Sequence, residues 1–231
     1  MRPFGRITDI RSAGLDGLIL YFGGDDLTQS NQAVQHCVQA LQYLNPTWLK
    51  ELLPAYDSLT IVFDPWLTDD HGVYRCLAEL PMNSQTVRFE GHHHRLPVWY
   101  GASQCNDFEH LCSYTGLLQS QIVDLHTQAR FRVFAVGFAP GFAYLGELPE
   151  QLACPRLATP RKRVPKGAVA IADRQTAVYP QASPGGWNLL GLCPVPMFDV
   201  GKSPASLLAV GDTVQFEAIS EQQYQEWCHE R

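Results

Sequence analysis

The chain has 231 residues, and 45% of them are hydrophobic, which allows one large domain or two modest ones with a sizeable core. A formal net charge of −6 disfavours a general nucleic-acid-binding surface, which is normally strongly basic. No stretch approaches the roughly 18–20 apolar residues that span a bilayer, and no apolar segment of signal-peptide type follows the N-terminus. The seven cysteines include no Cys-x-x-Cys pair, which predicts reduced thiols in a cytoplasmic protein. We therefore expect neither nucleic acid nor membrane as a partner.

Strands and helices alternate over the first part of the chain. Residues 18–22 form a short apolar run that ends in two glycines, and Asp26 precedes Gln29 at capping-box spacing. Apolar residues then recur at helical spacing up to Pro46 and again over residues 73–80. Further strands are predicted at residues 59–63 and 86–90. These patterns predict a small α/β domain over residues 1–92, of ferredoxin-like type.

The remainder, residues 93–231, is predicted to form a second, β-rich domain. Residues 91–95 are interpreted as a linker or a turn at a strand edge. Two short helices are expected after Asn106 and Ser120, and a helical or frayed segment over residues 221–231. Short β-prone runs then alternate with glycine and proline at residues 131–136, 169–172, 177–179 and 213–217. This pattern favours a barrel or sandwich, so the expected class is α+β.

Residues 133–199 combine glycine, proline, aromatic and basic residues without a helical or strand period. Long ordered segments of this kind are usually functional. Five cations fall within eleven residues of this otherwise acidic chain: Arg156, Arg161, Lys162, Arg163 and Lys166. Guanidinium and ammonium groups suit a phosphate or carboxylate ligand, whereas the alternative is a solvated loop.

The aromatic residues of this segment are candidates for the walls of a pocket, with barrel core as the alternative. They are Phe138, Phe142, Tyr144, Tyr179 and Trp187. Pro140-Gly141 and Pro184-Gly185 fit type II turns, which say nothing of a ligand by themselves.

The histidines that could carry chemistry are His126 and the consecutive His92, His93 and His94. His126 follows a helical stripe and is a general base, a ligand or a hydrogen-bonded core residue, of which the sequence alone favours the last. His92, His93 and His94 are consecutive, so at most two share a face of a strand, and no second pair stands at zinc-like spacing. We therefore predict no metal site. The common nucleotide-binding and serine-hydrolase motifs are also absent from the sequence.

A set of short motifs occurs in a fixed order along the second domain. They are Gly137-Phe138-x-Pro140-Gly141-Phe142-x-Tyr144-Leu145, Pro155-Arg156, Pro160-Arg161, Val164-Pro165-x-Gly167, Tyr179-Pro180 and Ser183-Pro184-Gly185-Gly186-Trp187. Together with His126 they resemble the family that contains the B subunit of the bacterial ATP-dependent 5-oxoprolinase, the sporulation kinase inhibitor KipI and allophanate hydrolase subunit 1.

The resemblance implies a small α/β domain followed by a cyclophilin-like β-barrel, and a heteromeric complex. In 5-oxoprolinase, the B, C and A subunits together open 5-oxoproline to L-glutamate at the expense of ATP, which is used with Mg as a substrate of the complex. The alternatives are a KipI-like inhibitor that binds a histidine kinase and a carboxyltransferase subunit of the allophanate hydrolase type, which needs a separate biotin carrier. A prolyl isomerase, suggested by the fold alone, ranks last.

By motif position, the resemblance marks catalytic and binding residues. The catalytic candidates are His126, Arg161 and Lys166, with the cations placed near developing negative charge and His126 moving a proton. The substrate- or anion-binding candidates are Phe138, Pro140, Phe142, Tyr144, Arg156, Arg163, Gln175, Tyr179, Gly185, Gly186, Trp187 and Asn188.

The sequence departs from the family pattern at several of these loops. Lys166 replaces the usual Ala, Asp173 the usual Gly, and Leu192-Cys193 the usual Arg-Thr. We expect Lys166 to compensate for the missing arginine and Asp173 to lower the local positive potential.

Overall fold

The computed structural model describes residues 5–80 and 91–229, and the chain divides into two compact units, residues 1–90 and 91–231. The sequence placed the corresponding boundary after residue 92. Each unit has its own hydrophobic core, so each is described by itself.

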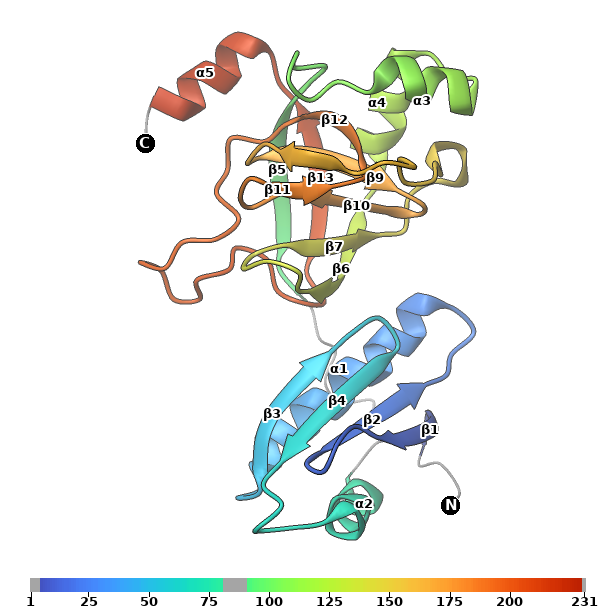
Figure 1. Ribbon diagram of the computed structural model, residues 1–231, viewed down its shortest axis with the longest axis vertical. Helices are drawn as coiled ribbons and strands as arrows, with labels where there is room; N and C mark the ends of the chain where they lie inside the picture. The colour runs from blue at the N-terminus through green and yellow to red at the C-terminus, as the bar shows by residue number, and fades with distance from the viewer. Residues whose placement is uncertain (1–4, 81–90, 230–231) are drawn as a thin grey trace. The chain divides into compact units, whose positions relative to one another are not determined.

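The first unit is an antiparallel sheet with a long helix packed on it (Figure 1). Its strands, in the spatial order β1-β2-β4-β3, are β1 (Ile7–Ser12), β2 (Gly17–Phe22), β4 (Ser58–Phe63) and β3 (Leu49–Pro54). The helices are α1 (Leu27–Leu44) and α2 (Asp70–Glu79). As its spacing predicted, Asp26 is the N-cap of α1 and accepts a hydrogen bond from the Gln29 N–H at 2.7 Å.

The described elements of this unit, within residues 5–80, do not complete a ferredoxin-like order. Over residues 5–80 the elements follow one another as ββαββα, whereas the ferredoxin-like order is βαββαβ. The ferredoxin-like expectation is therefore not confirmed. The strand predicted at residues 86–90 lies outside the described residues.

The second unit is a closed barrel, as the alternation of short β-prone runs with glycine and proline predicted. Within residues 91–229 the barrel order is β10 (Gln175–Val178), β7 (Ala143–Gly146), β6 (Phe131–Val136), β13 (Thr213–Ala218), β5 (His93–Tyr100), β12 (Asn188–Leu192) and β9 (Ala168–Ala172). All described pairs are antiparallel except β5 with β13. Residues 93–95 thus belong to a barrel strand and not to a linker.

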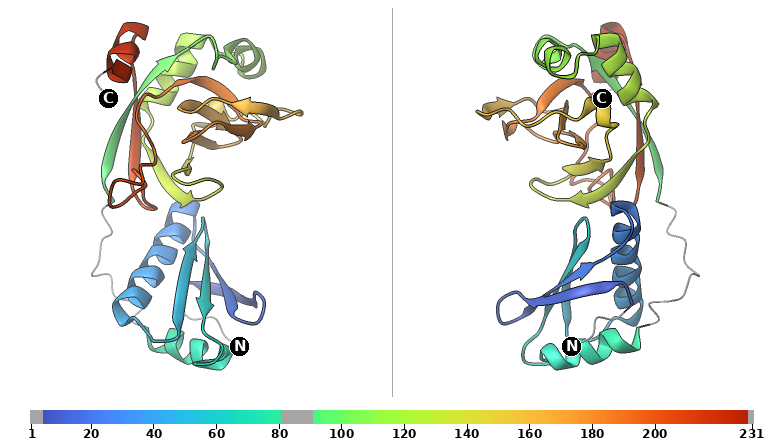
Figure 2. Two further views of the ribbon diagram at one scale, coloured as in Figure 1. Left: turned by 60° about the vertical axis from the view of Figure 1, so that its left-hand side comes forward. Right: turned by 90° about the vertical axis from the view of Figure 1, so that its right-hand side faces the viewer.

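The remaining elements of this unit lie outside the barrel wall. Strands β8 (Arg161–Val164) and β11 (Ser183–Gly185) pair with each other as a two-stranded arm, the gold and orange segment that extends from the barrel in Figure 2. Around the barrel lie α3 (Phe108–Thr115), α4 (Gln119–Gln128), the short 3-10 helix Glu150–Leu152 and α5 (Glu221–His229). No helix among the described residues is long and apolar enough to cross a membrane.

Candidate functional site

A cleft of about 180 Å³ opens between the β6–β7 loop and the β8–β11 arm, and we call it the aromatic cleft. Eight of the residues that the sequence analysis predicted as site residues line this cleft. They are Phe138, Phe142, Tyr144, Arg156, Tyr179, Gly185, Gly186 and Trp187. Leu157, Pro160 and Pro184 complete its lining.

Phe142 stands at the centre of the aromatic walls. Its ring centroid lies 4.9 Å from that of Tyr144, 5.3 Å from those of Phe138 and Tyr179, and 5.9 Å from that of Trp187, all in edge-on geometry. Such pairs contribute about 0.5–1.5 kcal/mol each beyond the burial of area. Phe142, Tyr179 and Trp187 are buried, so these rings are both packing core and cleft wall.

Phe138 differs from the other rings because its backbone is in the left-handed region, with φ of +72°. Its side chain is also 66% exposed, so burial offsets little of the strain. The turn that holds it is closed by two backbone hydrogen bonds, from Gly137 to the Phe142 carbonyl at 3.0 Å and from Phe142 to the Ala139 carbonyl at 2.9 Å. A bulky residue held at positive φ in a cleft is typical of a functional position.

We expect Phe138→Gly to be more stable than Phe138→Ala by about 1 kcal/mol, because only glycine adopts this φ without strain. At ordinary φ the order is the reverse, with alanine favoured. Urea unfolding of the two variants gives the difference. Ala158→Gly, at an exposed position of ordinary φ, is the control and should not stabilise the protein. Greater stability of the Phe138→Ala variant would contradict the inferred strain.

Arg156 is the cation of the aromatic cleft. Its guanidinium carbon lies 5.9 Å from the centroid of the Trp187 ring, and its Nε lies 3.7 Å from the Asp173 carboxylate. Its side chain is 60% exposed, so it retains donors that can bind a ligand carboxylate. Asp173 adopts φ of +52°, a conformation that aspartate tolerates better than most residues, which explains how it stands where the family pattern has glycine.

Glycine is required opposite the hydroxyl of Tyr179. A Cβ on Gly185 would lie 2.3 Å from the Tyr179 Oη, closer than atoms in contact can approach. Burial raises the pKa of the Tyr179 hydroxyl, although the charge of Arg156 opposes this shift, so the group stays a neutral hydrogen-bonding hydroxyl at the edge of the cleft.

Arg161 does not line the cleft but holds its wall in place. The guanidinium forms an ion pair with Asp107 and donates a hydrogen bond to the Trp187 carbonyl at 3.2 Å. The second Asp107 oxygen accepts a hydrogen bond from the Leu189 N–H at 2.6 Å. The predicted catalytic role of Arg161 is therefore not supported by its position, and it is a positioning residue for Trp187. Sequence reasoning missed Asp107, because nothing in the pattern links residues 54 positions apart.

His126 lies in the barrel core, with no exposed surface. Its Nε2 and Nδ1 lie 2.9 Å from the Thr176 hydroxyl and 2.7 Å from the Tyr100 hydroxyl. Thr176 donates its own proton to the Ala170 carbonyl at 3.1 Å, so Nε2 carries the imidazole proton and Nδ1 accepts from Tyr100. Burial lowers the pKa of His126 to about 3. An enclosed, neutral and fully hydrogen-bonded imidazole does not fit the predicted proton transfer.

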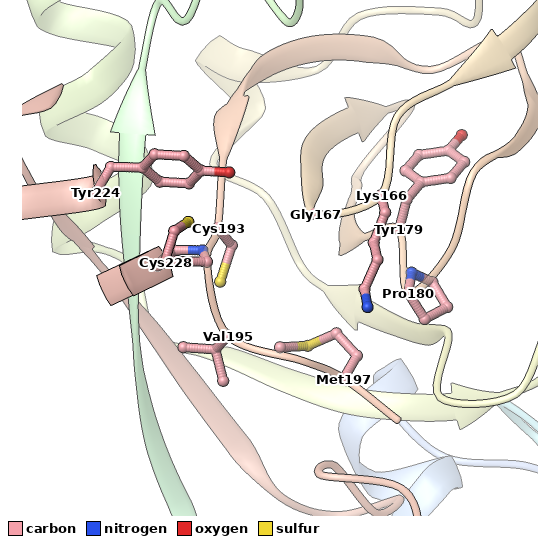
Figure 3. A pocket seen from close by; sticks show the side chains of 10 residues that line it. Lys166, Gly167, Tyr179, Pro180, Cys193, Val195, Met197, Tyr224 and Cys228 are labelled. Atoms are coloured by element: carbon pink, nitrogen blue, oxygen red, sulfur yellow. The ribbon is translucent and has the colours of Figure 1, made fainter. Parts of the chain in front are cut away.

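Lys166 lines a second cleft of about 140 Å³, shown in Figure 3. Lys166 and Pro180 lie on one side of this cleft, and Tyr224, Cys193 and Cys228 on the other. The Cys193 N–H donates to the Gly167 carbonyl at 2.8 Å, so two departures from the family pattern meet at one place. The ring of Tyr179 lines both clefts.

The other marked residues lie outside both clefts. Asn188 is fully buried and donates to the Pro155 carbonyl at 3.0 Å, which holds the loop that carries Arg156. Pro140 and Arg163 are exposed, and Gln175 begins β10. Among the described residues, no three His, Cys, Asp or Glu side chains are grouped so as to hold a metal ion.

Comparison with known proteins identifies the family to which this chain belongs. A family model described as the carboxyltransferase domain, subdomain C and D, matches residues 8–208. The chain is 32% identical to the 5-oxoprolinase B subunit of Bacillus subtilis (strain 168), over 96% of this chain and 97% of that protein. It is 37% identical to the 5-oxoprolinase B subunit of Haemophilus influenzae, over 72% of this chain and 78% of that protein. The chain belongs to the family of 5-oxoprolinase B subunits.

Solved structures agree with this assignment. The crystal structure of TTHA0988 superposes with a TM-score of 0.79 at 34% sequence identity, covering 92% of this chain. This chain corresponds to 40% of the length of TTHA0988. Kluyveromyces lactis urea carboxylase gives a TM-score of 0.74 over 94% of this chain and 22% of that chain, but at 16% identity it shows the fold alone.

Proposed function

We propose that this chain is the B subunit of a cytoplasmic, ATP-dependent 5-oxoprolinase and is inactive alone. It acts with the C and A subunits to open 5-oxoproline to L-glutamate: the lactam C–N bond is hydrolysed while ATP and water give ADP and phosphate. The observation that carries the proposal is the match to a 5-oxoprolinase B subunit over nearly the whole of both chains. The barrel is further proposed to be of the cyclophilin type. The relatives do not favour a kinase inhibitor or a carboxyltransferase component.

Within the complex, the aromatic cleft is proposed to bind 5-oxoproline. This substrate is a small, flat lactam with one carboxylate. A cleft of about 180 Å³ with ring walls and one arginine suits such a molecule in size and in chemistry. The carboxylate binds Arg156, whose guanidinium is only loosely held by Asp173 at 3.7 Å, and the ring packs against Trp187 and Tyr144. The left-handed backbone conformation of Phe138 directs its ring towards the same ligand.

ATP with Mg supplies the driving force when bound, by phosphorylating the amide oxygen of the lactam. The groups of this chain that bear on that chemistry are the neutral hydroxyl of Tyr179 and the cations Arg156, Lys162, Arg163 and Lys166. Asp107 and Arg161 hold Trp187, and His126 contributes to the packing of the barrel core.

The test is 5-oxoproline-dependent ATP hydrolysis by the complex that co-purifies with the tagged chain. We expect Arg156→Gln to raise the KM for 5-oxoproline about 10- to 100-fold, because a charge-assisted hydrogen bond contributes about 1.5–3 kcal/mol. Arg174→Gln is a matched control, since that exposed arginine has its nearest carboxylate at the same 3.7 Å. A complex without such activity would refute the function. An Arg156→Gln complex with the wild-type KM would refute only the binding site.

A further inference from the structure

One end of the first unit carries exposed apolar side chains that its own core does not use. Among residues 5–80, six large apolar side chains are exposed, and all but one stand at the same end of the sheet. These five, which we call the apolar end, are Leu15, Tyr43, Leu44, Trp66 and Leu67. Single exposed apolar residues are normal on a protein surface, whereas a gathering of several marks a site of interaction.

Three segments carry the apolar end: the turn between β1 and β2, the end of α1 and the loop after β4 (Figure 1). The turn and the loop are joined by the Phe63 N–H, which donates to the Asp16 carbonyl at 2.8 Å. The loop is joined to the connection between α1 and β3 by the Asp64 N–H, which donates to the Trp48 carbonyl at 2.8 Å. Backbone hydrogen bonds thus hold the three segments together at this end of the sheet.

Trp66 stands on an ordered turn. Its N–H donates to the Asp64 carboxylate at 3.0 Å, and the N–H groups of Leu67 and Thr68 donate to the Asp64 carbonyl at 3.0 and 3.1 Å. Pro65 fixes one further φ angle of the same turn. The Trp66 side chain is nevertheless 93% exposed. A tryptophan on preorganised backbone loses little freedom on binding, and tryptophan is enriched among the residues that dominate the affinity of protein interfaces.

The charge around the apolar end is acidic. Residues 12–16, 43–51 and 63–70 include five acidic residues and one basic residue. The basic one, Lys50, pairs with Asp64 at 2.9 Å. The other acidic residues are Asp16, Glu51, Asp69 and Asp70. Two copies of this face would bring like charges together, and anionic lipid or nucleic acid would be repelled. The face is matched instead by an apolar surface with lysine or arginine at its rim.

We propose that the apolar end binds a different protein chain, whose contacting face is apolar with a basic rim. Trp66 packs into the apolar centre of that face, and the carboxylates around it pair with the rim. The inference rests on the proposed function, in which this chain works in a complex, and it adds the surface by which a partner subunit is held. None of the residues that line the aromatic cleft takes part in it.

The experiment produces the tagged chain together with the C and A subunits and measures how much of each co-purifies. We expect the variant Leu15→Ser, Trp66→Ser to recover less than about a tenth of the partner that wild type recovers, because an anchoring tryptophan contributes a factor of about 30 or more in affinity. The variant Asp16→Lys, Glu51→Lys should also weaken binding, although it removes no apolar contact. Added salt should weaken the wild-type complex for the same electrostatic reason.

The matched control is Tyr114→Ser, Val200→Ser, which removes one aromatic and one aliphatic side chain that are exposed on the second unit. It should recover the partner as wild type does. Urea unfolding midpoints equal to that of wild type show that both serine variants remain folded, since all four side chains are exposed. Finally, p-benzoylphenylalanine in place of Trp66 should crosslink to a partner peptide in which lysine or arginine flanks apolar residues.

Several outcomes would overturn the proposal. One is recovery of the partner by the Leu15→Ser, Trp66→Ser variant at the wild-type level, and another is a wild-type chain that recovers no partner. A crosslink from position 66 to a second copy of this chain would assign the apolar end to self-association. Binding to phosphatidylcholine vesicles that is lost in the same variant would assign it to a lipid surface.

The two proposals fail in different ways. If the variant loses its partner but the wild-type complex shows no 5-oxoproline-dependent ATP hydrolysis, the interface stands and the proposed function falls. If the variant keeps its partner and hydrolyses ATP with 5-oxoproline as wild type does, the interface falls and the function stands.

Discussion

Replacing Asp107 with alanine should destabilise the barrel unit by about 3 kcal/mol. The substitution removes the carboxylate partner of Arg161 and the acceptor of the Leu189 N–H together. The Arg161 side chain is 30% exposed and that of Asp107 16%, so the charge left behind is partly but not fully hydrated. Breaking a buried pair costs about 3–5 kcal/mol, and the partial exposure places this one at the lower end.

Peptide-resolved hydrogen exchange in urea reports this loss, because it follows β8 and β12 separately from the first unit. Glu217→Ala is the matched control. It breaks an ion pair with Arg95 at 2.9 Å whose side chains are 46% and 66% exposed, and should cost less than about 1 kcal/mol. The double variant Asp107→Ala, Arg161→Met should recover part of the loss, since no unpaired charge remains. A stability of the single variant within about 0.5 kcal/mol of wild type, on the order of surface substitutions, would contradict this account.

The same clamp bears on the aromatic cleft. Arg161 reaches the carbonyl of Trp187, and Asp107 reaches the amide of Leu189, two residues further along the chain. Loss of the clamp therefore frees the residues that carry one wall of the cleft. We infer that the cleft, although built from loops, keeps its shape because a charged pair secures its wall to the start of α3.

Local sequence patterns predicted an element correctly where its structure depends mainly on its own residues. Asp26 capped the helix that its spacing with Gln29 predicted, and the apolar runs at residues 18–22 and 59–63 became β2 and β4. Strands β1 and β3 were missed because they are edge strands with mostly exposed positions, so they lack a strong apolar pattern. The spatial order of the strands, β1-β2-β4-β3, depends on long-range pairing, which no local pattern in the sequence encodes.

For the candidate site, the sequence indicated which residues belong together but not what each one does. The density of glycine, proline and aromatic residues marked the segment that forms the cleft. The partner of Arg161 and the backbone of Phe138 depend on chain contacts that no local pattern encodes. His126 was ambiguous by residue type, and only its enclosure between Tyr100 and Thr176 distinguishes a core residue from a proton carrier.

The burial of His126 predicts a specific dependence of stability on pH. Its pKa is about 3 in the folded protein, below the ordinary value of 6.5 that applies on unfolding. Between these values the unfolded chain binds a proton that the folded chain does not, so stability rises with pH. The contribution is fully present above pH 6.5 and is lost as the pH falls towards 3. At about pH 4.5 the loss amounts to about 3 kcal/mol.

A variant without the imidazole isolates this contribution from that of the carboxylates. In Tyr100→Phe, His126→Phe the titrating group and its hydroxyl partner are both removed, and Thr176 keeps its bond to the Ala170 carbonyl. The double variant should be less stable than wild type at pH 7. By about pH 4.5 the two should be equally stable, because only in wild type does unfolding expose an imidazole that then takes up a proton. His110→Gln, which changes an exposed histidine, should leave the pH dependence unaltered. Parallel stability curves for wild type and the double variant between pH 7 and about 4.5 would show that His126 is accessible to protons, and would restore it as a candidate for proton transfer.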